Sequence, residues 1–278
     1  MIDLHTHSTA SDGHLSPAAL VARAKSRGVQ RLALTDHDTI AGIPEARRAA
    51  ATHDIDLIPG AEISVTWQRR TLHVVGLGLD IDHPVLMDGL ARHQDERETR
   101  AADIGERLAR IGLHDGLARA RAHTDGGQIT RSHYADLLVA DGLARNRQDA
   151  FKRYLRPGRP GYRRTVWAEL PEVIAWIHAA SGTAVLAHPF GYGCSGAWRR
   201  RMVAAFAEAG GDALEICTGV SSLEQESQSA RDAREHALAG SVGSDFHSPE
   251  QIWLDIGRVR PLPSSVIPTS YVTETPAL

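Results

Sequence analysis

The chain opens with MIDLHTHSTASDG (residues 1–13), in which a short apolar stretch runs directly into His5 and His7. Side chains two residues apart on an extended backbone project from the same face, so His5 and His7 are expected to point together. Asp12 follows within Ser11-Asp12-Gly13, a sequence that also favours a turn. The opening therefore predicts a strand whose C-terminal end carries imidazole and carboxylate groups.

Further histidines and acids recur at the ends of other predicted strands. They are Asp36, His37, Asp38, Glu62, His73, His188, Asp245 and His247. In a barrel of parallel strands, the C-terminal strand ends converge on one mouth. Imidazole and carboxylate together form a ligand set that suits a divalent hydrolytic metal. We therefore predict one multinuclear metal centre and a metal-dependent hydrolase; Asp38 is expected to support the centre or to cap a helix.

Strands and helices alternate along both ends of the chain. Strands are predicted at 1–5, 31–35, 56–58, 61–67, 71–79, 183–187, 213–217 and 241–243, and helices at 16–28, 40–52, 85–112, 169–181, 196–209 and 221–238. Pro59-Gly60 is expected to interrupt the strand that begins at Asp56. Residues 61–67 and 71–79 are expected to form a hairpin. Repeated βα units favour a closed barrel or a doubly wound sheet.

The middle of the chain has no convincing strand. A long helix rich in Arg, Asp and Glu leads into short helical stretches and a segment rich in Pro and Gly, residues 156–161. We interpret residues 88–164 as a helical insertion and residues 1–87 and 165–278 as the barrel. We expect the insertion to contribute to substrate binding.

Bulk composition limits the other possibilities. The 278 residues carry a formal net charge of −3, so the whole chain is not a general polyanion binder. Cys194 and Cys217 are its only cysteines, which excludes a disulfide framework and favours a reducing compartment. No apolar run approaches the roughly 18 residues of a membrane span. We expect a cytoplasmic protein without a membrane partner.

Local positive charge marks the candidate substrate site. Eight Lys or Arg residues lie between Arg145 and Arg164, against the single acid Asp149, with Tyr154 and Tyr162 interleaved. A polyanion pocket with aromatic rings for a base explains this pattern, and a solvated basic face is the alternative. The candidate substrate contacts are Arg97, Arg100, Arg131, His133, Tyr134 and His14.

These motifs resemble the polymerase-and-histidinol-phosphatase (PHP) family. The resemblance rests on His5-Thr6-His7-Ser8, Ser11-Asp12-Gly13, Thr35-Asp36-His37-Asp38, Gly60-Ala61-Glu62-Ile63, Ala187-His188-Pro189 and Gly243-Ser244-Asp245-Phe246-His247. It implies a distorted seven-stranded (β/α) barrel with two or three divalent metals. One metal would take His5, His7, Glu62 and Asp245; a second would share Glu62 and add His73 and His188; a third would take Asp12, His37 and His247.

The carboxylate at Asp12 favours manganese, with magnesium, iron or zinc as alternatives. The insertion and the Ser-Asp-Gly segment are similar to the branch of nucleoside 3′,5′-bisphosphate phosphatases, some of which degrade short RNA from the 5′ end. The resemblance implies hydrolysis of a 3′-phosphate by a metal-activated hydroxide, with His5, His7, Asp12, His37, Glu62, His188, Asp245 and His247 as catalytic residues.

The expected substrates are a small phosphorylated nucleotide or a short oligoribonucleotide, and not duplex DNA. A phosphatase of the histidinol-phosphate type and a metal-binding module without turnover remain as alternatives. The sequence does not determine the oligomeric state.

Overall fold

Seven strands form one sheet in the order of the chain in the computed structural model, which describes residues 1–124 and 127–272. The strands are β1 (Ile2–Asp3), β2 (Arg31–Leu34), β3 (Asp56–Trp67), β4 (Arg70–Leu77), β5 (Thr183–Leu186), β6 (Ala213–Thr218) and β7 (Ala239–Gly243). β4 pairs antiparallel with both β3 and β5, and the other neighbours are parallel. The sheet is therefore a mostly parallel one with a single reversed strand.

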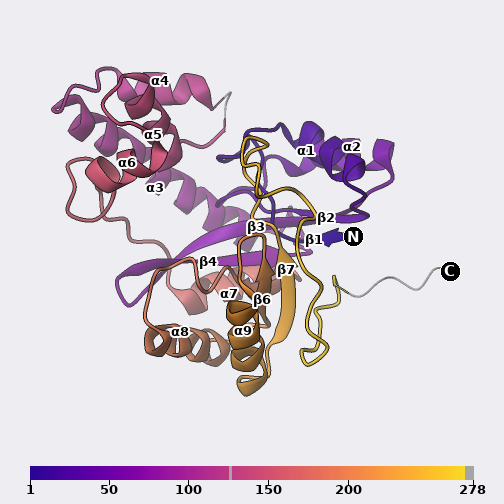
Figure 1. Ribbon diagram of the computed structural model, residues 1–278. Helices are drawn as coiled ribbons and strands as arrows, with labels where there is room; N and C mark the ends of the chain where they lie inside the picture. Colours follow the sequence, from indigo (N-terminus) through magenta and orange to yellow (C-terminus); the bar gives the residue numbers. More distant parts are fainter. Residues whose placement is uncertain (125–126, 273–278) are drawn as a thin grey trace.

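Hydrogen bonds between the first and last strands close this sheet. The N–H of Leu4 donates to the carbonyl of Val242 at 3.1 Å, and the N–H of Asp245 donates to the carbonyl of His5 at 2.9 Å. The strands consequently surround a common axis, with helices outside them (Figure 1). The prediction of a distorted seven-stranded barrel is confirmed. Closure of the barrel also brings residues 5–7 and 245–247 side by side, although they lie far apart in the sequence.

The expected break at Pro59-Gly60 is wrong, because β3 continues through both residues. The carbonyl of Pro59 accepts from the N–H of Leu79 at 3.0 Å, so the backbone there stays paired. Up to Pro59 the strand pairs with β2, and from Gly60 onward it pairs with β4. A β-carbon at Gly60 would lie 2.7 Å from the Gly76 carbonyl oxygen, so this change of partner requires glycine.

Five helices cover the barrel. They are α1 (Pro17–Ser26), α2 (Ile43–His53), α7 (Leu170–Ala179), α8 (Gly196–Glu208) and α9 (Leu223–Glu235). The predicted start of the first of them is confirmed, because the Ser16 hydroxyl accepts from the N–H of Ala19 and Pro17 is the first helical residue.

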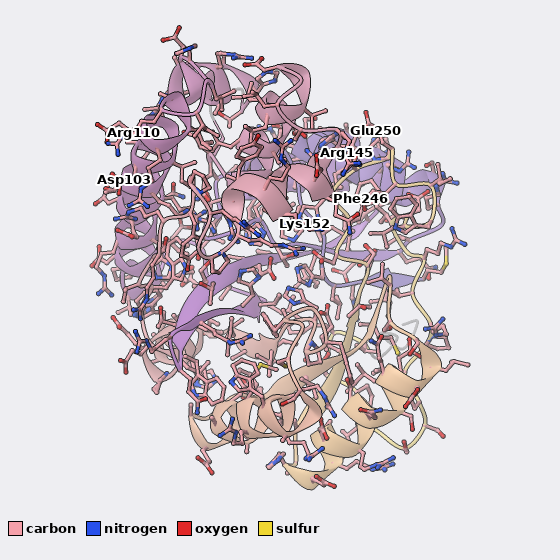
Figure 2. The ribbon with its side chains drawn as sticks, turned by 60° about the vertical axis from the view of Figure 1, so that its left-hand side comes forward. Asp103, Arg110, Arg145, Lys152, Phe246 and Glu250 are labelled. Atoms are coloured by element: carbon pink, nitrogen blue, oxygen red, sulfur yellow. The ribbon has the colours of Figure 1, made fainter. Side chains whose placement is uncertain are left out.

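The remaining helices form the insertion, which lies to one side of the barrel in Figure 1. They are α3 (Pro84–Ala109), α4 (Gly116–His123), α5 (Arg131–Ala140), α6 (Arg147–Ala150) and the π-helix η1 (Phe151–Leu155). Figure 2 shows Asp103 on the outer side of α3, with Arg110 just past the end of this helix. The insertion approaches the barrel where Arg147 lies 3.3 Å from His14.

The long helix α3 belongs to two hydrophobic cores. Leu86 and Leu90 pack in the barrel core with α7, whereas Ala101, Ile104 and Leu108 pack in a separate core within the insertion. The expected boundary at residue 88 thus falls inside one continuous helix. We propose that the insertion is attached through α3 rather than through a flexible linker.

Each helix of the described residues is too short or too polar to cross a lipid bilayer.

Candidate metal centre

His5 and His7 project into the mouth of the barrel as their spacing predicts. Both are buried, and their Nε2 atoms lie 3.1 Å apart. The Oε2 atom of Glu62 is 3.4 Å from each of these nitrogens. Asp245 Oδ1 lies 3.6 Å from His5 Nε2 and 3.3 Å from His7 Nε2. The ends of β1 and β7 and the middle of β3 therefore present two imidazoles and two carboxylates around one point. The expectation that every ligand lies at a strand end is wrong for Glu62, because β3 continues past it to Trp67.

Glu62 is the residue that joins the two halves of the centre. Its side chain is fully buried. Oε1 lies 3.0 Å from Nδ1 of His73 and 2.8 Å from Nε2 of His188, while Oε2 lies 2.8 Å from Nδ1 of His37. The two oxygens of one carboxylate thus contact different imidazoles, with His73 and His188 at Oε1 and His37 at Oε2. Glu62 therefore lies between two groups of histidines.

Asp12 forms a further group with two histidines. Its Oδ1 atom is 3.7 Å from Nε2 of His37 and 3.4 Å from Nε2 of His247. The ring of His247 also stacks on His7 with centroids 4.1 Å apart. The predicted metal-site residues consequently gather in one place.

This donor set fits divalent cations. Two ligands about 2.1 Å from a tetrahedral ion stand about 3.4 Å apart, which is the separation found between most donor pairs here. Three groups can each hold an ion, namely His5, His7 and Asp245; His37, Glu62 and His73; and His7, Asp12, His37 and His247. Among the described residues, Nδ1 of His7, Oδ1 of Asp12 and Oε2 of Glu62 are buried without a hydrogen bond. Such orphaned atoms are costly unless an ion or water pairs with them.

The charges of the centre are strongly coupled. Burial would raise the pKa of Glu62, but His73, His37 and His5 hold it well below its usual value. Burial lowers the pKa of His7 to about 3, and the charge of His247 acts in the same direction. Burial would also lower the pKa of His247, yet the carboxylates of Asp12 and Asp245 raise it to about 10. The acids are thus held ionised, ready to bind a cation.

Two of the strand-end residues adopt left-handed backbone conformations. His188 has φ of 27° and Asp245 has φ of 58°. This region is unfavourable for residues other than glycine, although Asp and His tolerate it better than most. Such conformations concentrate at functional sites, where the surrounding structure enforces them.

Glu215 supports the centre and was missed by the sequence analysis. This buried carboxylate on β6 accepts from Nδ1 of His5 at 3.0 Å and from the backbone N–H of His188 at 2.6 Å. It fixes the tautomer of His5 and orients its Nε2 toward the centre. The available signal was a glutamate in the middle of the otherwise apolar stretch 213–217.

The Ser-Asp-Gly segment is held by Asp36. The hydroxyls of Ser8 and Ser11 each donate to this buried carboxylate at 2.6 Å, and the N–H of Ser8 donates at 2.7 Å. Because both hydroxyls are engaged, they position the loop that carries Asp12. They show no partner of the kind that activates a serine nucleophile.

Asp38 connects the centre to the insertion. It accepts from the N–H of Ser64 at 2.6 Å, from Nδ1 of His93 at 3.0 Å and from Nε of Arg97 at 2.7 Å. Burial would raise the pKa of Asp38, but Arg97 and His93 lower it. Asp38 therefore anchors α3 and does not cap a helix, because Gly42 occupies the N-cap position of α2.

A cavity of about 550 Å³ lies between the metal centre and the insertion. We call it the arginine cavity. Asp12, His37 and His73 form its inner end, and its walls include Arg69, Arg70, Arg97, Arg100, Arg131, Arg163 and Arg164. Phe151, Tyr162, Trp167 and Tyr192 also line it. Trp167 and Phe151 were not among the sequence-based candidates.

Two arginines of this cavity stand out by their environment. Within the described residues, neither Arg100 nor Arg131 forms an ion pair; their guanidinium groups lie over the rings of Trp167 and Phe151, at 5.2 and 5.9 Å from the centroids. Burial is the main cause that lowers the pKa of both groups. At Arg100 the positive charge of Arg97 adds to it, whereas at Arg131 Tyr162 opposes it and Arg97 adds a smaller decrease. Partly buried cations without counter-ions are suited to an anionic ligand.

Three of the expected substrate contacts have other roles. Tyr134 is fully buried in the insertion core and donates to the carbonyl of Ala101 at 2.7 Å, so it is not available to a ligand. His133 accepts from the N–H of Thr130 at 2.9 Å and closes the capping box of α5. His14 lies 3.3 Å from Arg147 and 3.2 Å from Ser248, at the junction of the insertion and the barrel.

Comparison with known proteins agrees with this geometry. The family model described as the PHP domain matches residues 3–149. The chain is 46% identical to a 5′-3′ exoribonuclease of Haemophilus influenzae, with 96% of both chains covered. It is 44% identical to the 5′-3′ exoribonuclease Rnm of Escherichia coli (95% of this chain, 90% of the relative). It is 40% identical to a 3′,5′-nucleoside bisphosphate phosphatase of Chromobacterium violaceum (94% and 92%).

Solved structures share the fold. An amidohydrolase from Chromobacterium violaceum with bound sulfate has a TM-score of 0.90 at 40% identity, covering 96% of this chain and 93% of that one. A protein of Bifidobacterium adolescentis described as a metal-dependent phosphoesterase has a TM-score of 0.83 at 27% identity, covering 98% and 93%. These relatives confirm the prediction of a metal-dependent phosphoester hydrolase. The chain belongs to the PHP family.

Proposed function

We propose that this enzyme removes the 3′-phosphate from nucleoside 3′,5′-bisphosphates. The observation that carries the proposal is the arginine cavity, which opens directly onto the metal centre and contains two arginines without carboxylate partners among residues 1–124 and 127–272. A bisphosphate has one phosphate to be cleaved and a second to be held. The relative from Chromobacterium violaceum, named for this substrate class, supports the assignment.

Residues of the chain would divide the work between holding ions and holding substrate. We propose that His5, His7, Glu62 and Asp245 hold one divalent ion, that Glu62, His73 and His188 hold a second, and that Asp12, His37 and His247 hold a third. The ions, when bound, lower the pKa of a coordinated water and neutralise the phosphate oxygens. We propose manganese because oxygen ligands from three acids accompany the imidazoles.

The insertion would supply the substrate contacts. Arg100 and Arg131 bind the 5′-phosphate, since their guanidinium groups reach the cavity and no acid of the described residues forms an ion pair with them. Arg97 also lines the cavity, but its Nε and Nη2 atoms are engaged by Asp38, so its main role is to position α3. Trp167 and Phe151 lie beneath the two arginines and keep them extended over the cavity.

Short RNA is the second candidate substrate, supported by the relatives named as exoribonucleases. The same bond, between phosphorus and a 3′-oxygen, is broken in both substrates. Duplex DNA is not proposed, because the cavity of about 550 Å³ matches a nucleotide rather than a helix. Free thiols at Cys194 and Cys217 support a cytoplasmic location.

The test compares two phosphomonoesters. Manganese-loaded protein should release phosphate from adenosine 3′,5′-bisphosphate far faster than from histidinol phosphate, because only the bisphosphate has a second anion for Arg100 and Arg131. Equal or reversed rates would discard the nucleotide assignment. Elemental analysis of protein purified without added metal tests the choice of manganese.

A further inference from the structure

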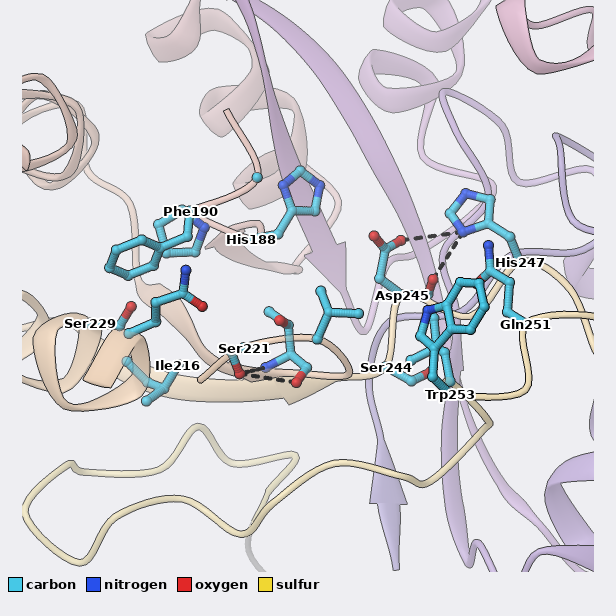
Figure 3. A pocket seen from close by; sticks show the side chains of 16 residues that line it. His188, Phe190, Ile216, Ser221, Ser229, Ser244, Asp245, His247, Gln251 and Trp253 are labelled. Carbon is cyan, nitrogen blue, oxygen red and sulfur yellow. Dashed lines mark hydrogen bonds and ion pairs between the residues drawn. The ribbon is translucent and has the colours of Figure 1, made fainter. Parts of the chain in front are cut away.

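A second cavity lies on the other side of the metal centre. It has a volume of about 460 Å³, and His188, Asp245 and His247 form its inner end (Figure 3). We call it the neutral cavity, because none of the described residues that line it is a lysine or an arginine. The arginine cavity reaches the same centre through Asp12, His37 and His73. A substrate that occupies both cavities must therefore pass the metal ligands.

The walls of the neutral cavity suit a flat, uncharged ring. Trp253 lines it although its side chain is 62% exposed, and in Figure 3 it lies beside Gln251, close to His247. Ile216 and Phe190 provide an apolar surface on the side opposite Trp253 in Figure 3. An indole ring left in water costs hydrophobic free energy, which stacking on a nucleobase would recover.

The hydroxyl of Ser229 is a second, independent sign of a ligand. Ser229 is 1% exposed and lines the neutral cavity, and its Oγ atom forms no hydrogen bond within the described part of the chain. A buried hydroxyl without a partner is unfavourable, so a polar edge of a ligand would stabilise it. The amide of Gln251 offers another donor and acceptor in the same cavity.

The different linings of the two cavities indicate how a substrate that spans both would be oriented. Phosphate groups belong in the arginine cavity, and a nucleoside without net charge fits the neutral one. We propose that the neutral cavity binds the nucleoside on the 3′ side of the scissile phosphate in an oligoribonucleotide, with its base stacked on Trp253. The inference rests on the proposed function and deepens it, because it assigns a binding site to the second nucleoside of the RNA substrate.

The reaction would balance without any further reactant. One water oxygen bonds to phosphorus, the bond from phosphorus to the 3′-oxygen of the first nucleoside breaks, and that oxygen takes up a proton. The first nucleotide leaves as a 5′-monophosphate. The shortened chain keeps the phosphate as its new 5′-phosphate, which the arginine cavity can bind in the next cycle, so degradation runs from 5′ to 3′.

The experiment compares adenosine 3′,5′-bisphosphate with the 5′-phosphorylated dinucleotide pApA. Trp253→Ala should lower kcat/KM for the dinucleotide about tenfold or more relative to its effect on the bisphosphate, because one base–aromatic stack is lost. Trp253→Phe should restore most of the dinucleotide activity. On a dinucleotide analogue whose second ribose lacks a base, the wild type and Trp253→Ala should be equally active.

Ile252→Ala is the matched control, since Ile252 is 85% exposed beside Trp253 and does not line the cavity. It should leave the ratio of the two substrates unchanged. The inference is overturned if Trp253→Ala affects both substrates by the same factor, if Trp253→Phe does not rescue, or if wild-type protein cleaves the bisphosphate but not the dinucleotide. Failure to release phosphate from the bisphosphate would instead overturn the proposed function.

Discussion

The barrel rim and the insertion place functional groups at one centre by different physical means. By the rim we mean the metal-centre residues of the barrel, namely His5, His7, Asp12, His37, Glu62, His73, His188, Asp245 and His247. At the rim, residues such as His5 and Asp245 follow paired strands, and the closing hydrogen bond between these two residues sets their relative position. In the insertion, Arg97 and Arg100 lie on the same helix, three residues apart. Arg97 pairs with Asp38, whereas Arg100 has no acid partner in the part of the chain that the structure describes. Rim residues should therefore govern catalysis. In the insertion, Arg100 should govern substrate affinity, and Arg97 should hold α3 against the barrel.

The largest expected effect is at the rim. His7→Ala or Asp245→Asn should reduce kcat at least about a thousandfold, beyond the 10–100-fold typical of groups that only support a ligand, because a donor to the ions is lost. Asn is chosen at position 245 since it tolerates the left-handed backbone there. Initial rates with saturating manganese measure the effect, and circular dichroism checks the fold.

Asp88→Ala, on the exposed side of α3, is the matched control and should retain full activity. Activity near the wild-type level in both rim variants would show that these residues are not ligands.

A large but different effect is expected where the insertion meets the barrel. Arg97→Ala should destabilise the protein by about 3–5 kcal/mol, because it leaves the buried carboxylate of Asp38 without its cation. Urea unfolding measures the loss, and hydrogen exchange should locate it in α3 and the insertion.

Arg92→Ala on the same helix serves for comparison. Arg92 pairs with Glu172 at 2.8 Å on the surface, and such exposed pairs contribute at most about 1 kcal/mol. Similar losses in the two variants would mean that Asp38 does not anchor α3.

Glu215 sharpens the comparison, because it belongs to the barrel but lies behind the ligands. Glu215→Gln keeps the shape of the side chain and removes the charge that orients His5. Metal affinity should fall about 10–100-fold, as is usual for partners of a ligand. Titration of metal-free protein with manganese, read out as recovered activity, measures the change. Saturating metal should restore most of kcat, and a kcat defect that metal cannot rescue would place Glu215 in the chemistry instead.

The sequence predicts the rim better than the insertion, and local geometry explains why. A ligand at a strand end is fixed by the two-residue period of the strand and by backbone pairing, so His5 and His7 could be placed from spacing alone. The role of Glu215 could not be predicted, because a single acid in an apolar strand forms no repeating pattern.

In the insertion, the direction of a helical side chain depends on the tertiary contacts of that helix. Tyr134 and Arg131 are three residues apart on α5, but one fills the core and the other faces the cavity. The pairing of Asp38 with Arg97 joins residues 59 positions apart, which no local pattern reveals.

The smallest expected effect concerns Arg100 and Arg131, the two arginines of the arginine cavity that form no ion pair within the described residues. Arg100→Ala or Arg131→Ala should raise KM for adenosine 3′,5′-bisphosphate about tenfold each, since a charge-assisted contact to phosphate contributes about 1.5–3 kcal/mol. Neither change should alter kcat to a similar degree, because the ligands of the rim stay in place. Arg110→Ala is the control and should leave KM unchanged, because Arg110 is exposed just past the end of α3 and does not line the arginine cavity (Figure 2). A loss confined to kcat would show that these arginines contact the scissile phosphate. Residues of the insertion would then take part in catalysis, and the assignment of catalysis to the rim and of substrate affinity to the insertion would be wrong.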